Sequence, residues 1–157
     1  TSGELVIKGD NVLLEYFKNE EATQGAFSED GYFLTGDLGV EDEEGFFFIT
    51  GRKKELIIKG GENISPREID DTLYKHNAVL EACTFGIEDD NYGEEISACV
   101  YLKDDLVANE EELLDLCKAD LGEYKTPRQI IFVDKPLPKG PSGKIQRLKI
   151  ASQYSSA

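Results

Sequence analysis

The chain has 157 residues, 39% hydrophobic and 31% charged, so it can bury one core of ordinary size, and a second compact unit would have to be small. Its 32 acidic residues against 17 basic ones give a formal net charge of -15, which excludes nucleic acid and anionic membranes as general partners. One histidine, His76, and three cysteines without close spacing exclude a His/Cys zinc cluster and a histidine-based triad.

The three cysteines, Cys83, Cys99 and Cys117, are an odd number, which fits a reducing compartment better than a disulfide framework. We therefore expect buried thiols, a cytoplasmic location and no metal ligands in the chain. No apolar run approaches the length of a membrane span, and the first residues lack the features of a signal peptide. Because the sequence contains no methionine, we expect it to begin inside a longer protein.

The first fifty residues predict short strands and turns. Strand candidates occupy residues 4–9 and 31–40. The acidic turn at residues 41–45 and the apolar run at residues 46–50 predict a hairpin with the second of these strands.

A helix signal follows the next strand candidate, residues 55–61. Ser65, Pro66 and Glu68 combine an N-cap residue, a first-turn proline and a glutamate three residues after the cap. The helix should begin there and end near His76.

The second half of the chain predicts three further strands and two helices. Strands are expected at residues 79–87, 96–102 and 129–134, the second with clear alternation of apolar and polar side chains. Asn109 and Glu112 are typical of a capping box, and Gly122 of a helix end.

Residues 135–144, with three prolines and two glycines, predict an exposed loop before a short closing helix from about Ile145. Helices and strands are mixed without strict alternation, which favours a small α+β domain over a doubly wound one. The loop is no Walker phosphate loop, because Pro138 and Ile145 occupy the places that require Gly and Ser/Thr. Lys144 is then either a surface lysine after a tight turn or a point charge inserted into a site built elsewhere.

Five segments taken together resemble the last five conserved blocks of the adenylate-forming superfamily of acyl-CoA synthetases, carrier-protein adenylation domains and beetle luciferases. The segments are GELVIKGDNVLLEYF, GYFLTGD, GRKKELIIKGGENISPREID, LGEYKTPRQIIFVD and LPKGPSGKIQR, in order over nearly the whole chain. The resemblance implies that residues 1–51 end a large adenylation domain, as a short all-β remnant. Residues 52–157 would be the complete mobile C-terminal lid domain, with a central, mostly antiparallel sheet flanked by helices.

The resemblance also assigns residues to ATP. Asp37 resembles the aspartate that accepts hydrogen bonds from the ribose hydroxyls, and Arg52 the arginine that contacts the ribose and phosphate region. Asn63, where many relatives carry Gln or Arg, is expected beside the nucleotide. The alternatives are a turn-capping residue for Asp37 and a surface ion pair for Arg52. Ile58 departs from the lysine of coumarate-ligase-like and luciferase-like members.

Lys144 resembles the catalytic lysine of the family. A cation there would bridge the substrate carboxylate and the α-phosphate, lowering the repulsion between two anions while the acyl-adenylate forms. The resemblance implies that Mg²⁺ assists the leaving pyrophosphate.

For the second step, the resemblance implies that the domain turns about a hinge at Lys54. The turn would withdraw Lys144 and bring Gly60 and Gly61 against the pantetheine of coenzyme A, where any side chain would narrow the channel. Lys118 lies near where relatives offer a cation to the CoA phosphates. Its alternative is a solvated helix lysine.

The function implied is activation of a carboxylic acid with ATP to an acyl-adenylate and pyrophosphate, followed by formation of the acyl-CoA thioester. The ending SGKIQR is more similar to CoA ligases than to the NGKVDR form of carrier-protein adenylation domains. A domain that loads a carrier protein and a non-catalytic interaction module remain as alternatives. Because the family's phosphate loop, adenine segment and acyl pocket lie upstream, we expect the missing N-terminal adenylation domain to be the partner and the fragment alone to be inactive.

Overall fold

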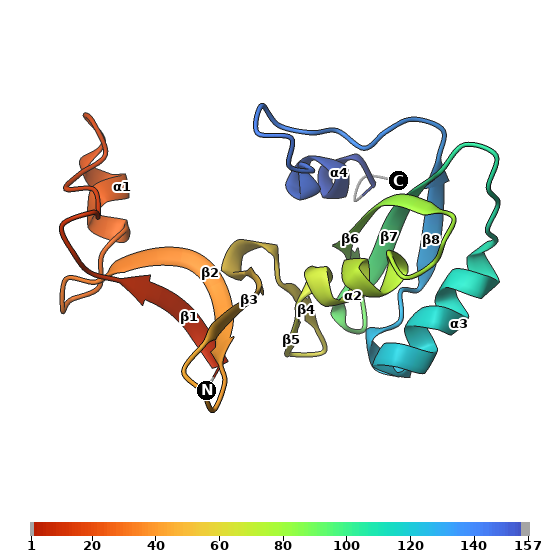
Figure 1. Cartoon of the computed structure of the whole chain (residues 1–157), viewed down its shortest axis with the longest axis horizontal. Helices are drawn as coiled ribbons and strands as arrows, with labels where there is room; N and C mark the ends of the chain where they lie inside the picture. Colours follow the sequence, from red (N-terminus) through yellow and green to blue (C-terminus); the bar gives the residue numbers. More distant parts are fainter. Residues whose placement is uncertain (1, 155–157) are drawn as a thin grey trace. The chain divides into compact units, whose positions relative to one another are not determined.

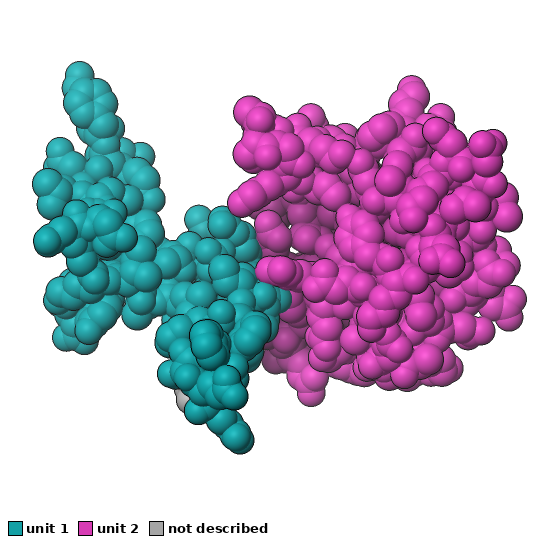
Figure 2. Space-filling view, viewed as in Figure 1, with its two compact units in different colours: residues 1–54 teal, residues 55–157 magenta. Residues whose placement is uncertain are grey.

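The computed structural model describes residues 2–154. The chain divides into two compact units, residues 1–54 and residues 55–157 (Figure 2). The boundary follows Lys54, the residue expected as the hinge. The assignment of the units to a large and a small domain of one enzyme stays a prediction.

The first unit contains a three-stranded antiparallel sheet in the order β1-β2-β3 (Figure 1). Its strands are β1 (Ser2–Ile7), β2 (Phe33–Glu41) and β3 (Phe47–Arg52). The hairpin predicted at the acidic turn is confirmed. In that turn the Asp42 carboxylate accepts hydrogen bonds from the backbone N–H groups of Glu44 and Phe46, both at 2.9 Å.

A short helix in the first unit was missed by the sequence analysis. Helix α1 (Glu20–Gly25) has no buried residue and therefore no apolar periodicity to reveal it. Its one local signal is Asn19, whose side chain accepts a hydrogen bond from the Ala22 N–H at 3.1 Å.

The first unit buries few of its own side chains. Several large apolar side chains on or near its strands are exposed, among them Phe46 at 60% and Phe47 at 63%. Leu14 and Phe17 in the loop after β1 are 91% and 84% exposed. Since folded domains normally bury such residues, this sheet lacks the cover that an independent domain would have.

The second unit is built on a five-stranded sheet in which the order is β5-β4-β7-β6 and β8 lies beside β7 (Figure 1). The strands are β4 (Ile57–Lys59), β5 (Glu62–Ile64), β6 (Val79–Asp89), β7 (Gly93–Leu102) and β8 (Gln129–Val133). All pairs are antiparallel except β7 with β8. The predicted α+β class with a mostly antiparallel sheet is confirmed.

Helices cover both faces of this sheet. They are α2 (Pro66–Leu73), α3 (Glu110–Leu121) and α4 (Arg147–Tyr154), with the 3-10 turn η2 (Glu123–Lys125) after α3. Ile69 of α2 and Leu113 of α3 share one core with Val100 of β7, while Ile150 of α4 packs with Phe85 on the other side. None of the helices within residues 2–154 is long and apolar enough to cross a membrane.

The strand expected at residues 55–61 is wrong as a single element. The 3-10 turn η1 (Lys53–Glu55) occupies its beginning, and Gly60 and Gly61 form a tight turn between β4 and β5. Both glycines have positive φ, +56° and +85°. A two-residue hairpin loop with positive φ at both positions matches the strand twist, and glycine adopts it without strain.

The helix signals have mixed outcomes. The Asn109–Glu112 capping box is confirmed, with both reciprocal hydrogen bonds present. Ser65 makes no side-chain capping bond, and the Glu68 carboxylate accepts a hydrogen bond from the Lys125 ammonium at 2.7 Å. Helix α4 begins two residues later than expected, because the Gln146 N–H bonds back to the Pro138 carbonyl at 2.8 Å.

Candidate active site

Lys144 lies at the end of a closed loop between β8 and α4. The Gly140 N–H donates to the Lys144 carbonyl at 2.9 Å, and the Gly143 N–H donates to the Gly140 carbonyl at 2.9 Å. Lys139 and Ile145 form an antiparallel bridge across the loop. These bonds give a small hairpin-like bend, which narrows the positions that the Lys144 side chain can reach.

The Lys144 side chain is exposed, and no described residue forms an ion pair with it. The loop around it is anchored below, because Leu137 is buried and its N–H donates to the Glu81 carboxylate at 2.7 Å. Lys139 pairs with the same carboxylate. The bend is therefore held in place by its contacts with Glu81, and it exposes the unpaired Lys144 ammonium group to solvent.

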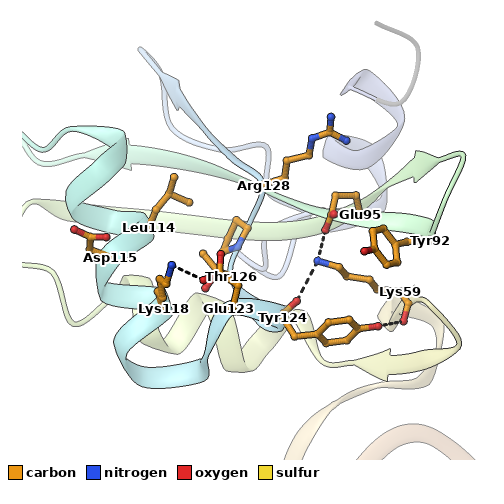
Figure 3. Close-up of a pocket in the computed structure, with 11 residues that line it drawn as sticks. Lys59, Tyr92, Glu95, Leu114, Asp115, Lys118, Glu123, Tyr124, Thr126 and Arg128 are labelled. Atoms are coloured by element: carbon orange, nitrogen blue, oxygen red, sulfur yellow. Dashed lines mark hydrogen bonds and ion pairs between the residues drawn. The ribbon is translucent and has the colours of Figure 1, made fainter.

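The turn at Gly60 is held by a reciprocal pair of hydrogen bonds with Tyr124. The Tyr124 hydroxyl donates to the Lys59 carbonyl at 2.6 Å, and the Lys59 ammonium donates to the Tyr124 carbonyl at 3.1 Å (Figure 3). A Cβ added at Gly60 would lie 2.8 Å from the Tyr124 hydroxyl oxygen. The turn therefore depends on glycine for its φ angle and also for the close approach of this ring.

Lys59 is 7% exposed, an unusual degree of burial for a lysine. Its ammonium pairs with the Glu95 carboxylate at 2.5 Å and lies 5.6 Å from the Tyr92 ring centroid and 5.0 Å from that of Tyr124 (Figure 3). A buried charge needs such compensation, since desolvation alone would be costly. The backbone of β4 is thereby fixed just before the glycine turn.

Lys118 borders the same cleft as Lys59, a hollow of ≈ 490 Å³ between α3, η2 and the sheet (Figure 3). Its ammonium pairs with Glu123, and that interaction raises the pKa of Lys118. Arg128 also borders the cleft and pairs with Asp89 at 3.0 Å. Both cations are exposed and carry carboxylate partners, so an anionic ligand would have to compete with those partners.

Asp37 and Arg52 lie opposite each other on β2 and β3, in the first unit. The Arg52 Nε contacts the Asp37 Oδ1 at 2.9 Å, with side chains 55% and 23% exposed. The structure thus brings together two residues that the resemblance assigns to the ribose. It also forms the ion pair that was the alternative for Arg52, now with Asp37 as the partner.

Two further predicted residues stand apart from these groups. Lys54 lies in η1 and is exposed, next to the unit boundary. Asn63 of β5 is exposed and pairs through its strand with Ile58, which is 54% exposed. Among residues 2–154, the side chains of Lys54 and Asn63 form no hydrogen bond or ion pair with another predicted site residue.

Sequence reasoning missed Glu95, Tyr124 and Arg147 as parts of these arrangements. Tyr124 and Arg147 belong to the motif segments LGEYKTPRQIIFVD and LPKGPSGKIQR, so their presence there was a usable signal. Glu95 lies near the start of β7, beside Glu94, and carries no local signal that separates it from its acidic neighbours. The three cysteines are free and buried, as expected.

Comparison with known proteins gives a consistent result. Residues 68–144 match the AMP-binding enzyme C-terminal domain. The chain is 49% identical to the sulfoacetate–CoA ligase of Cupriavidus necator, over 94% of this chain and 29% of that protein. It is 44% identical to the oxalate–CoA ligase of Saccharomyces cerevisiae, over 99% of this chain and 28% of that protein.

Among solved structures, ATP-bound MatB from Rhodopseudomonas palustris matches with a TM-score of 0.91 at 34% identity, over 99% of this chain and 31% of that chain. The chain therefore spans about 30% of the length of the relatives that it matches.

Proposed function

Since this chain belongs to the adenylate-forming CoA ligases and carries their AMP-binding enzyme C-terminal domain, we propose that it is the lid-bearing part of an acid–CoA ligase. The enzyme would activate a carboxylic acid with ATP, release pyrophosphate, and transfer the acyl group from the adenylate to the thiol of CoA. Residues 1–51 would close the large domain, and residues 52–157 would turn about Lys54 between the two steps.

The observation that carries this proposal is Lys144, an exposed ammonium group with no carboxylate partner among the described residues, on a bend closed by its own backbone hydrogen bonds. A cation kept free and aimed by a stiff loop suits the approach of a carboxylate to an α-phosphate, where negative charge accumulates. Lys144 is therefore the proposed catalytic residue of the adenylation step.

The pair of Asp37 and Arg52 supports a nucleotide site at the edge of the first unit. Arg52 contacts the Oδ1 atom of Asp37 and holds the carboxylate in place. The Oδ2 atom of an ionised carboxylate can accept hydrogen bonds from neighbouring hydroxyl donors, such as those of a ribose. Asn63 is kept as a further proposed contact with the nucleotide.

The Gly60–Gly61 turn supports a role in the thioester step. Both turn residues lack a side chain, and the hydrogen bonds between Lys59 and Tyr124 fix the shape of the turn. Such a surface suits close passage of a narrow chain such as pantetheine. Lys118, on the cleft beside Lys59, is the proposed contact for a CoA phosphate and would have to leave Glu123 to make it.

CoA is favoured over a carrier protein because the similar sequences from Cupriavidus necator and Saccharomyces cerevisiae are CoA ligases. The exposed apolar side chains of the first unit support a further large domain as its cover. Within residues 2–154 no three His, Cys, Asp or Glu side chains gather as metal ligands, so we assign no step through Mg²⁺ to residues of this chain.

The test is Lys144→Ala in the full-length protein that contains this chain, with Lys149→Ala as the matched control. Lys149 is an exposed lysine on α4, five residues further on. We expect Lys144→Ala to lower acid-dependent pyrophosphate release by about 10²- to 10³-fold, the usual effect of removing one group that stabilises the transition state. Thioester formation from supplied acyl-adenylate should survive in both variants.

The same proposal predicts that the 157-residue chain alone makes no acyl-adenylate, because the acid and adenine sites would lie in the other domain. The named substrates of the relatives differ, so the pyrophosphate screen should span short, dicarboxylic and fatty acids. Unchanged adenylation by Lys144→Ala, or acyl-adenylate formation by the chain alone, would contradict the division of roles.

A further inference from the structure

Arg147, the first residue of α4, uses every nitrogen of its guanidinium group on a different partner. Its Nε donates to the Glu55 carboxylate at 2.8 Å, its Nη2 to the Asp70 carboxylate at 2.9 Å, and its Nη1 to the Thr84 carbonyl at 2.5 Å. The side chain is 15% exposed. These three oxygen acceptors around one planar guanidinium group fix both the position and the orientation of the side chain.

The three partners come from three separate elements of the second unit. Glu55 is the last residue of η1 and directly follows Lys54, the proposed hinge. Asp70 belongs to α2, is 6% exposed, and also accepts the Thr84 N–H at 2.6 Å. Arg147 therefore joins the chain beside the hinge, a helix and the sheet at one point.

Arg147 lies three residues after Lys144, and the chain between them has little freedom. The Gln146 N–H donates to the Pro138 carbonyl at 2.8 Å, and Ile145 bridges to Lys139. On the other side, Ile150 of α4 is 1% exposed in the core with Phe85. A displacement of Arg147 would therefore be passed to the bend that carries Lys144.

A stability role alone explains this arrangement poorly. Burial is the largest single influence and disfavours the charged guanidinium. The charge of Asp70, the neighbouring Cys83 and the hydrogen bonds to Glu55 and Asp70 together outweigh it and raise the pKa of Arg147, so the group stays ionised. Buried ion pairs generally add little net stability, because desolvation offsets their attraction. They do impose geometry, since an uncompensated partner is costly wherever the side chains are displaced.

We propose that Arg147 is a positioning residue for the adenylation step, holding the Lys144 bend in fixed register with the hinge-proximal Glu55. When the second unit turns about Lys54, Glu55, Asp70 and Arg147 move as one body, and the Lys144 ammonium arrives at the reacting atoms in a set place. This inference rests on the proposed role of Lys144. It assigns Arg147 no contact with ATP or acid.

The experiment compares both half-reactions in the full-length protein for Arg147→Lys and Glu55→Gln, with Arg67→Lys as the control. Arg67 lies on α2 and is 52% exposed beside Asp71, so it undergoes the same substitution outside the network. Lysine keeps the positive charge at position 147 but lacks the planar guanidinium group that reaches all three acceptors. We expect kcat for adenylation to fall about 10- to 100-fold in Arg147→Lys, the scale of a displacement of about 1 Å, with KM for ATP unchanged.

Thioester formation from supplied acyl-adenylate should stay within about twofold in Arg147→Lys, since Lys144 is withdrawn in that step. Glu55→Gln should shift the same half-reaction in the same direction by a smaller factor. Arg67→Lys should leave both half-reactions unchanged. A loss shared equally by both half-reactions, in step with a lower Tm, would overturn the inference in favour of a structural role.

Amide hydrogen exchange in the 157-residue chain gives a readout independent of activity. Arg147→Lys should speed exchange at Gly140, Gly143 and Gln146, whose N–H groups close the bend, and leave the amides of β7 unchanged. Unchanged exchange at the bend would overturn the inference. Lys144→Ala separates this failure from that of the proposed function: if it abolishes adenylation while Arg147→Lys is normal, only the positioning role is lost.

Discussion

Replacing Gly60 by alanine tests how the turn between β4 and β5 is built. A Cβ at this position would lie 2.8 Å from the Tyr124 hydroxyl oxygen and 3.4 Å from the Tyr92 Cδ1, and φ is +56°. Gly61 has φ +85° and no atom within 4 Å of such a Cβ. Gly61→Ala is therefore the matched control, because it introduces the backbone strain without the steric overlap.

The magnitudes follow from two contributions. A residue other than glycine in the left-handed region costs about 1–2 kcal/mol. At Gly60 the methyl group would also push the Tyr124 hydroxyl off the Lys59 carbonyl, and a lost hydrogen bond costs about 0.5–1.5 kcal/mol. We expect the free energy of unfolding to fall by about 1–2 kcal/mol in Gly61→Ala and by about 1.5–3.5 kcal/mol in Gly60→Ala.

Tyr124→Phe completes a double-mutant cycle. Alone it should cost about 1 kcal/mol, the value of the hydroxyl's hydrogen bond. In the Gly60→Ala background it should add almost nothing, because that variant has already broken the hydrogen bond between the Tyr124 hydroxyl and the Lys59 carbonyl. The sum of the two single changes should therefore exceed the change in the double variant by about 1 kcal/mol.

The assay is urea unfolding of the 157-residue chain, followed by circular dichroism, with slopes compared to verify a common unfolded state. Equal destabilisation by Gly60→Ala and Gly61→Ala would show that the Tyr124 ring does not restrict the turn. Strict additivity in the cycle would refute the contact between the two residues. Either result would also remove the physical basis for the shape of the proposed pantetheine surface.

Three further predictions concern the second unit. Asn109→Ala removes the capping box of α3 and should cost about 1 kcal/mol of unfolding free energy, measured by the same urea titration. Leu113→Ala empties a fully buried site in the core and should cost about 2–5 kcal/mol, with a smaller loss if the helices close the cavity. Burial raises the pKa of Cys83 to about 12 and those of Cys99 and Cys117 to about 11. Because their unfolded pKa is about 8.5, stability should be complete below that pH and fall as pH rises towards the folded values. A thiol reagent at about pH 8 should label them only after denaturation, and labelling of the native chain would contradict this.

Several features could be predicted from the sequence because their causes are local. The α3 cap needs only Asn109 and Glu112 three residues apart, and the hairpin turn at residues 41–45 needs only its acidic and glycine residues. The α+β class followed from the alternation in β7 and the helix signals around it. The short helix α1 escaped because it buries nothing, and the break at Gly60 escaped because an apolar strand pattern continues up to it.

The candidate site divides in the same way. Motif segments singled out Lys144, Asp37 and Arg52 as individual residues, and strand pairing then placed the last two at 2.9 Å. Their proposed chemistry still depends on the rest of the enzyme.

Only the tertiary structure joined Arg147 to Glu55, 92 positions away, and enclosed Lys59 between Glu95 and Tyr124. The physical reason is that a lysine or arginine side chain can pair with any carboxylate within reach, and this chain contains 32 acidic residues. Sequence determines which side chains carry charge and which short segments form turns and helices. The packing of the helices and of the loop between β8 and α4 on the sheet decides which of those charged side chains are buried together. Only buried pairs hold their side chains in one fixed geometry.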